Sequence, residues 1–305
     1  MAHKKGHRTT TLALAMGLAA AWAFTTNLPE AAVTTNKLAS NKLASNKLAS
    51  NKLASNKLAS NRLAQNALSS TRLEANLASA EILSTADGRE VYSYVIGCAL
   101  SDATTIEATI PGAQDTAPPD TLYTCVNERC TFMGGLGLAP YWSDRKLDPK
   151  GQRWVSACLL ARVNLHETAE AISVRGLAPE LAVSADEAEL FVVEEGAFFG
   201  NIFTDDDGPI DWNACRGRDQ AAGEFGGLFL RDCTEPDPAD PAHTLCGFNF
   251  AGDCIDFSPE SPSPYGCRSF DAEEGTYGDC HQGAGDGHWP GLRPYREIIT
   301  TYVTD

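Results

Sequence analysis

The chain has 305 residues, of which 40 are Asp or Glu and 24 are Lys or Arg, so its formal net charge at pH 7 is −16. Such an acidic chain argues against nucleic acid as the partner of its acidic part, because phosphate binding needs clustered Lys and Arg. Ten cysteines, all after residue 97, favour an exported protein stapled by disulfides.

Residues 1–23 have the order of a secretory signal peptide. Three basic residues precede an apolar run, Leu12 to Phe24, and Ala21-Trp22-Ala23 is a small-x-small cleavage site. The run is shorter than the about 20 apolar residues that a spanning helix needs. We therefore expect export to the periplasm, the cell surface or the extracellular medium, with no membrane span after cleavage. An uncleaved anchor is the alternative.

Residues 24–83 are predicted to be a low-complexity spacer. Residues 36–60 are five identical copies of Asn-Lys-Leu-Ala-Ser, followed by a decayed continuation. A period of five matches neither a helix nor a strand, and leucines five apart turn by about 140° on a helix, so no apolar face forms. We expect residues 25–83 to add little to the stability of the rest of the chain.

The repeat resembles the pentapeptide-repeat family over roughly residues 36–83. That resemblance implies square coils with the central leucine pointing inward; Asn at the position where the family prefers a small residue departs from the pattern. A disordered, extensible spacer is the alternative.

The spacer is basic, with no acid between residues 36 and 73. Its identical copies contribute five lysines: Lys37, Lys42, Lys47, Lys52 and Lys57. These charges suit electrostatic contact with an anionic cell-surface polymer. The simpler alternative is that they keep a repetitive segment solvated.

Residues 84–305 are predicted to form one acidic α+β domain. Ser84 or Thr85 can cap a helix that runs to about Leu100, and Asp148 with Pro149 starts a second helix that continues to Asn164. The first strands are expected at Thr104–Ile110 and in a hairpin of Leu122–Val126 and Arg129–Met133 around Asn127-Glu128, after a loop at 112–120.

The second half of the domain is predicted to hold further strands and a loop-rich lobe. Strands are expected at Thr168–Arg175, Leu190–Val193, Ala197–Phe203 and Arg296–Val303, with Glu194-Glu195-Gly196 separating the middle two. Residues 205–289 are rich in Gly, Pro, Asp and Cys, so we expect a lobe that packs on one sheet and is fixed by disulfides. The fold class is thus a disulfide-stapled α+β domain with two main helices and antiparallel strands.

Disulfides account for the cysteines better than zinc, because only Cys125 and Cys130 are close in sequence. Those two lie across the predicted hairpin turn, and Cys98 and Cys158 lie among apolar residues of the two helices, so we predict these two pairs. The other six, Cys215, Cys233, Cys246, Cys254, Cys267 and Cys280, allow 15 pairings. Pairs of neighbours, 215–233, 246–254 and 267–280, are the simplest.

Few patterns in the chain point to catalysis, and Gly-x-Ser-x-Gly, His-Glu-x-x-His and a phosphate loop are missing. Asp205, Asp207 and Asp211 are candidate oxygen ligands for calcium, although the EF-hand spacing fails; an exposed acidic turn is the alternative. We expect no other cofactor.

Two further patterns have a chemical and a plain interpretation. His281 and His288 could gather a metal with Asp286, or they are solvated histidines in a glycine-rich loop. Gln152 and Cys158 have the spacing of a papain-like oxyanion glutamine and nucleophile, but the cysteine falls well inside the predicted helix rather than at its amino end. A Cys98–Cys158 bond would exclude a free thiolate.

Three stretches, Arg153–Asn164, Glu194–Phe203 and Ala214–Gln220, resemble a group of secreted proteins of gliding predatory bacteria. The resemblance covers most of residues 85–305 and carries over no activity and no catalytic residue. The sequence therefore favours a non-catalytic surface or extracellular binding or structural protein over an enzyme. A secreted hydrolase acting on extracellular polymer or prey material is the alternative.

Overall fold

The computed structural model describes residues 63–68, 80, 82–117, 123–163, 171–203, 211–221, 246, 248–255, 265–285 and 294–305. Contacts divide the chain into Met1–Ala32 and Val33–Asp305, and every described residue belongs to the second unit. The predicted signal peptide and the five identical repeats lie outside the described residues. Among the residues that are described, no helix is long and apolar enough to cross a membrane.

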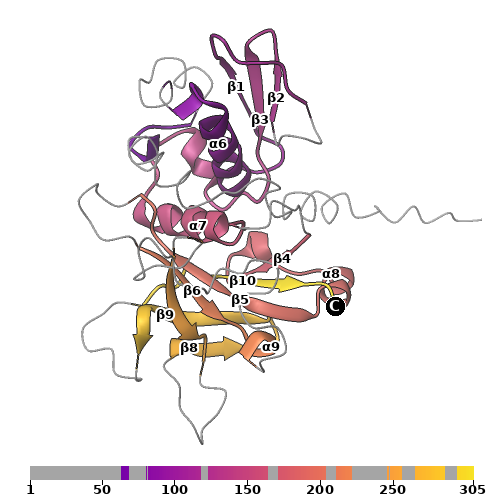
Figure 1. Cartoon of the computed structure of the whole chain (residues 1–305), viewed down its shortest axis with the longest axis vertical. Helices are drawn as coiled ribbons and strands as arrows, with labels where there is room; N and C mark the ends of the chain where they lie inside the picture. Colours follow the sequence, from indigo (N-terminus) through magenta and orange to yellow (C-terminus); the bar gives the residue numbers. More distant parts are fainter. Residues whose placement is uncertain are drawn as a thin grey trace, which may run out of the picture. The chain divides into compact units, whose positions relative to one another are not determined.

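Two helices lie between a small and a large sheet (Figure 1). Helix α6 (Ala86–Ala99) begins at Thr85, whose hydroxyl accepts the backbone N–H of Gly88 at 2.9 Å. Helix α7 (Pro149–Leu160) begins at Asp148, whose carboxylate accepts the backbone N–H of Gly151 at 2.9 Å. Both predicted caps are confirmed, because each side chain satisfies one N–H that the first helical turn leaves open.

The small sheet is antiparallel, with the order β1-β3-β2. Its strands are β1 (Thr105–Thr109), β2 (Tyr123–Val126) and β3 (Arg129–Met133), as the sequence predicted. Asn127 and Glu128 both have positive φ, 49° and 66°, which is the geometry of the tight two-residue turns that match strand twist.

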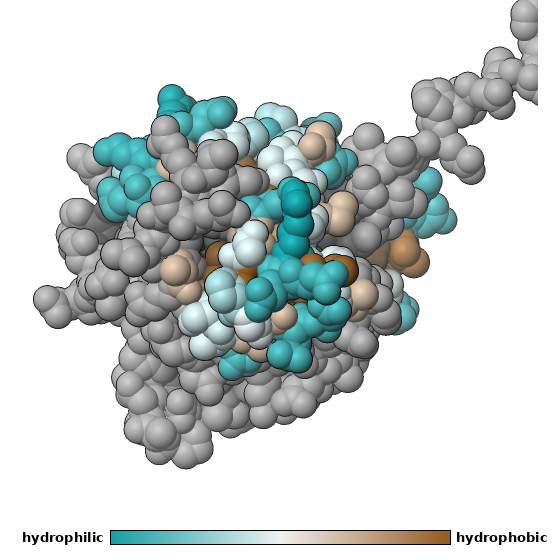
Figure 2. All heavy atoms as spheres, turned by 90° about the horizontal axis from the view of Figure 1, so that it is seen from above, coloured by the Kyte–Doolittle hydropathy of each residue, from teal (hydrophilic) through white to brown (hydrophobic). Residues whose placement is uncertain are grey.

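Figure 2 views the end of the molecule that carries the small sheet; its coloured surface is mostly hydrophilic, with small separate hydrophobic areas. Large apolar side chains that are exposed within the described part of the chain include Val126 and Met133 on the hairpin. Scattered exposed residues of this kind are normal for a protein surface.

The large sheet has seven strands in the order β4-β10-β5-β6-β7-β8-β9. Neighbours are antiparallel except for the parallel pairs β6–β7 and β7–β8. The strands are β4 (Ser173–Arg175), β5 (Val193–Gly200), β6 (Trp212–Arg216), β7 (Asn249–Asp253), β8 (Tyr265–Asp271), β9 (Thr276–Gly285) and β10 (Ile299–Val303). The predicted closing strand is thus confirmed as β10, and it lies inside the sheet, between β4 and β5.

Strand β5 corrects the sequence prediction. We expected two strands separated by Glu194-Glu195-Gly196, but one strand runs through all three residues. The two acids are buried because each has partners: Glu194 accepts the hydroxyls of Tyr277 and Tyr302, and Glu195 accepts the hydroxyl of Thr301 at 2.7 Å. A carboxylate that is fully hydrogen-bonded can remain in a buried strand.

The segment that we expected to pack on a sheet instead extends it. Residues 205–289 contribute β6, β7, β8 and β9 in their described parts. The residues of β5 then alternate between two cores: Phe198 faces the core that includes α6 and α7, whereas Ala197 and Phe199 face a smaller core with β7, β8 and β9. One face of the sheet therefore packs against the two main helices, and the other face carries the smaller core with the 215–254 and 267–280 disulfides.

Four short helices complete the described elements. They are η1 (Pro140–Ser143), η2 (Pro179–Leu181), α8 (Ala185–Leu190) and α9 (Arg218–Ala221). The prediction of a strand beginning at Leu190 was wrong, because that residue ends α8, which is capped by Ser184 through a bond from the N–H of Glu187 at 3.2 Å. Helix α7 ends at Leu160, before the predicted Asn164.

Four disulfides join described cysteines. Cys98–Cys158 ties α6 to α7, and Cys125–Cys130 closes the β2–β3 hairpin, as predicted. Of the three neighbouring pairs, Cys267–Cys280 is confirmed across β8 and β9, but Cys215 pairs with Cys254, so the pairs 215–233 and 246–254 were wrong. Cys246 is also disulfide-bonded, and its partner lies outside the described residues. The parallel pairing of β6 and β7 explains the Cys215–Cys254 bond, because Arg216 lies opposite Asp253.

Part of the decayed repeat packs into the domain. Leu63, Ala64 and Leu68 are buried in the larger core, and the backbone N–H of Leu68 donates to the backbone oxygen of Trp142 at 2.7 Å. The expectation that residues 25–83 offer no apolar face to the domain is therefore wrong for this stretch. Sequence periodicity misled us because the leucines need not share a helix face when the chain wraps in a turn, as the bond from Asn66 N to Leu63 O shows.

Candidate functional site

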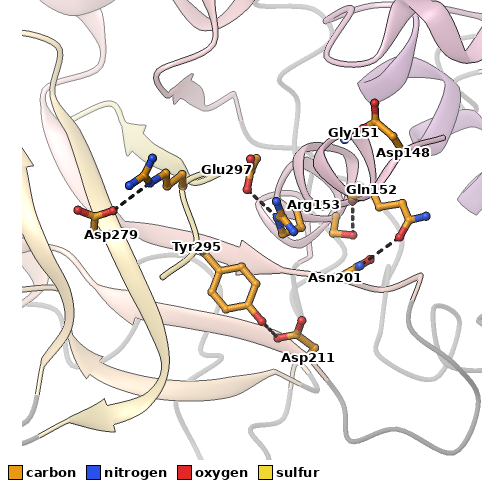
Figure 3. Close-up of polar contacts among 11 residues, drawn as sticks. Asp148, Gly151, Gln152, Arg153, Asn201, Asp211, Asp279, Tyr295 and Glu297 are labelled. Atoms are coloured by element: carbon orange, nitrogen blue, oxygen red, sulfur yellow. Dashed lines mark hydrogen bonds and ion pairs between the residues drawn. The ribbon is translucent and has the colours of Figure 1, made fainter. Parts of the chain in front are cut away.

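The candidate site is a polar cluster beside α7, where α7, the ends of β5 and β6 and the segment before β10 meet (Figure 3). Arg153 of α7 donates through Nε to Glu297 at 2.6 Å. The side chain of Arg153 is 34% exposed and that of Glu297 is 9% exposed, so the guanidinium faces solvent while its partner is largely covered. This hydrogen bond raises the pKa of Arg153, and the guanidinium and the Glu297 carboxylate form an ion pair.

Asp211 is the second carboxylate of the cluster. It accepts the hydroxyl of Tyr295 at 2.6 Å and the side-chain amide of Asn213 at 3.1 Å (Figure 3 shows the tyrosine contact). Burial raises the pKa of Asp211, and the bonds from Tyr295 and Asn213 and the charge of Arg153 oppose that shift. The pKa of Tyr295 is also raised, by burial and by its bond to Asp211, so the tyrosine is a stable hydrogen-bond donor.

A glycine allows Asp211 to lie this close to β5. Gly200 has a φ of +140°, and a Cβ at this position would lie 2.0 Å from the backbone oxygen of Asp211. The next residue, Asn201, donates its backbone N–H to that same oxygen at 2.7 Å. Only glycine has both the backbone freedom and the absent side chain that this approach requires.

Hydrogen bonds to α7 fix the end of β5. The side-chain amide of Asn201 donates to Gln152 at 3.2 Å, and the hydroxyl of Ser156 accepts the N–H of Ile202 at 2.9 Å. The same hydroxyl donates to the backbone oxygen of Gln152 at 2.7 Å. Ser156 is fully buried and uses its hydroxyl in both directions, so it is a structural link and offers no nucleophile.

A groove of about 320 Å³ opens on another face of α7. Its walls combine aromatic, apolar and charged side chains: Leu138, Pro140, Tyr141, Asp148, Lys150, Gly151, Trp154, Leu177, Ala178, Pro179 and Glu180. Tyr141 forms a hydrogen bond with Asp148, and burial together with this bond raises its pKa to about 12. A Cβ on Gly151 would lie 2.2 Å from the Tyr141 hydroxyl, so glycine is needed there.

The structure brings together few of the residues that the sequence singled out. Asp211 lies in the polar cluster, whereas Asp205, Asp207, Asp286 and His288 lie outside the described residues. His281 is in strand β9 and is 1% exposed, so the alternative of a solvated loop histidine was wrong for this residue. Burial lowers the pKa of His281, and the nearby charge of Arg268 lowers it further.

Cys158 is joined to Cys98, so the papain-like interpretation fails for lack of a thiolate. Within the described part of the chain, three cysteines, Cys215, Cys254 and Cys267, form the one group close enough to hold a metal ion. All three are in disulfides, which leaves them no charged sulfur to offer a metal.

Sequence reasoning missed most of the polar cluster. Glu297 lies 144 residues from Arg153, and Tyr295 lies 84 residues from Asp211. A signal was present at Gly200-Asn201, since a glycine followed by Asn at the end of an apolar run is typical of a special backbone conformation.

Comparison of the chain with models of protein families, with curated proteins and with solved structures found no match.

Proposed function

We propose that this protein is an exported, non-catalytic binding or structural protein of the cell surface or the extracellular space. Its acidic, disulfide-stapled domain is carried on the basic repeat spacer. The disulfides support a role in an oxidising compartment, since such bonds persist mainly outside the cytosol. The resemblance to secreted proteins of gliding predatory bacteria points to the same compartment.

One observation carries the non-catalytic proposal: in the described residues, the cysteines and the Ser156 and Tyr295 hydroxyls in and beside the polar cluster are already committed. None of the described cysteines is free, and the Ser156 hydroxyl is hydrogen-bonded both as donor and as acceptor. The hydroxyl of Tyr295 donates to Asp211. A nucleophile needs a base within reach and an open path to the substrate, and none of these groups has both.

The groove on α7 supports a binding role for the domain. Its mixture of Tyr141, Trp154, Lys150 and Glu180 is the mixed apolar and polar lining that ligand sites use. The five lysines of the repeat supply a separate, electrostatic contact to an anionic cell-surface polymer. The domain itself is acidic, so the groove on α7 and the lysines of the repeat would bind partners of different chemistry.

The test uses the whole mature chain and immobilised polygalacturonate as the anionic polymer. The chain should be retained at low salt and released as salt rises, because exposed charges are screened. A matched variant with Lys37, Lys42, Lys47, Lys52 and Lys57 all changed to Gln should not be retained. Failure of the unaltered chain to bind at low salt would contradict the spacer's part of the proposal.

A secreted hydrolase is the second candidate, and the polar cluster is the observation that favours it. Asp211 is half-buried with a raised pKa, which is the environment of a general acid, and Arg153 and Tyr295 lie beside it. Incubation with casein, peptidoglycan and polygalacturonate should release no soluble product. Release that is abolished by Asp211→Asn would replace the binding proposal with this one.

A further inference from the structure

The described residues 63–68 belong to two successive units of the repeat, and both units place their leucine in the core. The units are Asn-Arg-Leu-Ala-Gln at 61–65 and Asn-Ala-Leu-Ser-Ser at 66–70. Leu63 is 1% exposed and Leu68 is 0% exposed, whereas Gln65 and Asn66 between them are exposed. The five-residue frame of the identical copies therefore continues into a stretch that packs against the domain.

The surface that receives this stretch, which we call the repeat seat, is formed by Trp142 and Leu147. The indole N–H of Trp142 donates to the backbone oxygen of Asn66 at 2.9 Å, and the backbone oxygen of Trp142 accepts the N–H of Leu68 at 2.7 Å. The N–H of Leu147 donates to the backbone oxygen of Ala64 at 2.9 Å.

All three of these hydrogen bonds use backbone atoms of the repeat, so they do not depend on which copy is present. The side chains that become buried are two leucines and Ala64, and every identical copy also offers Leu followed by Ala. By these contacts alone, any pair of adjacent copies could occupy the repeat seat.

One buried position distinguishes the units. Ala67, the second residue of its unit, is 5% exposed. The second residue is Lys in all five identical copies and Arg in the units at 61–65 and 71–75. Lys and Arg are almost never fully buried without a partner, so a basic side chain at this position opposes docking.

We infer that the repeat seat is a recognition site for the peptide pattern Leu-Ala-x-Asn-Ala-Leu and that Ala67 determines which unit occupies it. Among the eight units of residues 36–75, only the one at 66–70 has a small residue in the second place. The identical copies then remain outside the seat, and their number can change without altering the docked unit. The spacer thus acquires a defined end at Leu63.

The first test changes Ala67 to Lys in the full chain. We expect the melting temperature to fall by about 5 °C. The lysine either buries an unpaired amine or forces the unit at 66–70 out of the repeat seat, and both outcomes lower the free energy of unfolding. Gln65→Lys is the matched control, because it adds the same side chain at an exposed position of the same stretch, and it should leave the melting temperature unchanged. Equal melting temperatures for the two variants would overturn the role of Ala67.

The second test asks whether the seat recognises the pattern itself. Adding Lys57→Ala to the Ala67→Lys chain creates Leu53-Ala-Ser-Asn-Ala-Leu58, which has the required pattern one copy pair earlier. The melting temperature should recover in part, since ten additional residues in a loop cost little. Hydrogen exchange should show that protection of the Leu68 amide is lost and that the Leu58 amide becomes protected.

The control for rescue is Lys57→Ala alone, which should change neither the melting temperature nor the exchange pattern while Ala67 holds the seat. A destabilised Ala67→Lys chain that is not rescued by Lys57→Ala would show that Ala67 only fills space. That result would refute recognition of the repeat pattern. Neither outcome depends on binding to an external polymer, so the proposed function and this inference fail separately.

Discussion

Loss of the Cys98–Cys158 disulfide should destabilise the domain more than loss of a disulfide between cysteines that are close in sequence. The bond joins α6 to α7 over a sequence separation of 60, whereas Cys125–Cys130 closes a separation of 5. A cross-link stabilises mainly by restricting the unfolded chain, and the restriction grows with the logarithm of the loop length. That relation gives about 4 kcal/mol for the long loop and about 2 kcal/mol for the short one.

The experiment compares two double variants, Cys98→Ala with Cys158→Ala and Cys125→Ala with Cys130→Ala. All four cysteines are 0% exposed, so the cavity left by each missing sulfur is similar in the two variants and largely cancels. For a domain of this size, 1 kcal/mol shifts the melting temperature by about 2–4 °C. We expect a loss of about 8–16 °C for the first variant and about half of that for the second.

Thermal melting of the oxidised proteins by circular dichroism measures the difference, and peptide mapping without reductant checks that the remaining pairs are intact. Equal losses in the two variants, or a larger loss from the hairpin pair, would refute the loop-length reasoning. Rapid alkylation of Cys158 in the unaltered protein without reductant would refute the bond itself and restore the thiolate that a cysteine enzyme requires.

Three further predictions concern the site, the buried histidine and the spacer. Gly200→Ala should lower the melting temperature by several degrees, because its Cβ would lie 2.0 Å from the backbone oxygen of Asp211. Gly97→Ala in α6 is the control, since its Cβ meets no atom within 4 Å and should stabilise the protein slightly. Thermal melts of both variants test this. His281 has a lowered pKa in the folded state, so its contribution to stability is complete above the unfolded pKa of about 6.5 and is lost as pH falls below that value. Thermal melts from pH 8 to pH 5 test this. The melting temperature should fall less steeply with decreasing pH for His281→Gln than for the unaltered chain. Deletion of residues 36–60 should leave the melting temperature unchanged. Deletion of residues 36–73 should lower it, because Leu63 and Leu68 are removed from the core. Equal melting temperatures for the two deletions would contradict that packing.

Local signals in the sequence were sufficient to predict the helices and the hairpin in the first half of the domain. Thr85 and Asp148 each precede an apolar helical pattern, and Asn127-Glu128 separates two short runs of strand-forming residues. These signals are local because caps and tight turns are satisfied by atoms three or four residues away. The Cys98–Cys158 pair followed from the same helices, since two packed helices bring apolar positions together.

The same kind of reasoning failed where partners distant in the sequence determine whether a residue is buried. Glu194 and Glu195 look like a break in a strand, but partners distant in the sequence, among them the hydroxyls of Tyr277, Tyr302 and Thr301, allow them to be buried. Helix α8 carried a usable signal that we overlooked, because Ser184-Ala-Asp-Glu187 has the capping-box spacing. In the structure Glu187 instead accepts the hydroxyl of Ser173 at 2.7 Å.

The candidate site was largely hidden for a related reason. In the sequence Arg153 is an unremarkable charged residue of a predicted helix, and Asp211 stood out only as a candidate calcium ligand of an acidic turn. Their partners Glu297 and Tyr295 come from the segment before β10, which reaches them because β10 is inserted between β4 and β5. No pattern within a short window contains that pairing.

The position of the C-terminal disulfides follows from how little apolar surface the strands around them supply. Among the described residues, the smaller core has nine buried hydrophobic residues, and four of these are the cysteines of the 215–254 and 267–280 bonds. The Sγ atoms of Cys215 and Cys267 are 3.6 Å apart, so the two bonds contact each other and their sulfurs form the centre of that core. Each cysteine therefore both cross-links the chain and fills volume, which a stretch poor in Leu, Ile and Val needs in order to order itself. The larger core has enough aliphatic and aromatic residues of its own, and there the disulfides add restriction of the unfolded chain to packing that already exists.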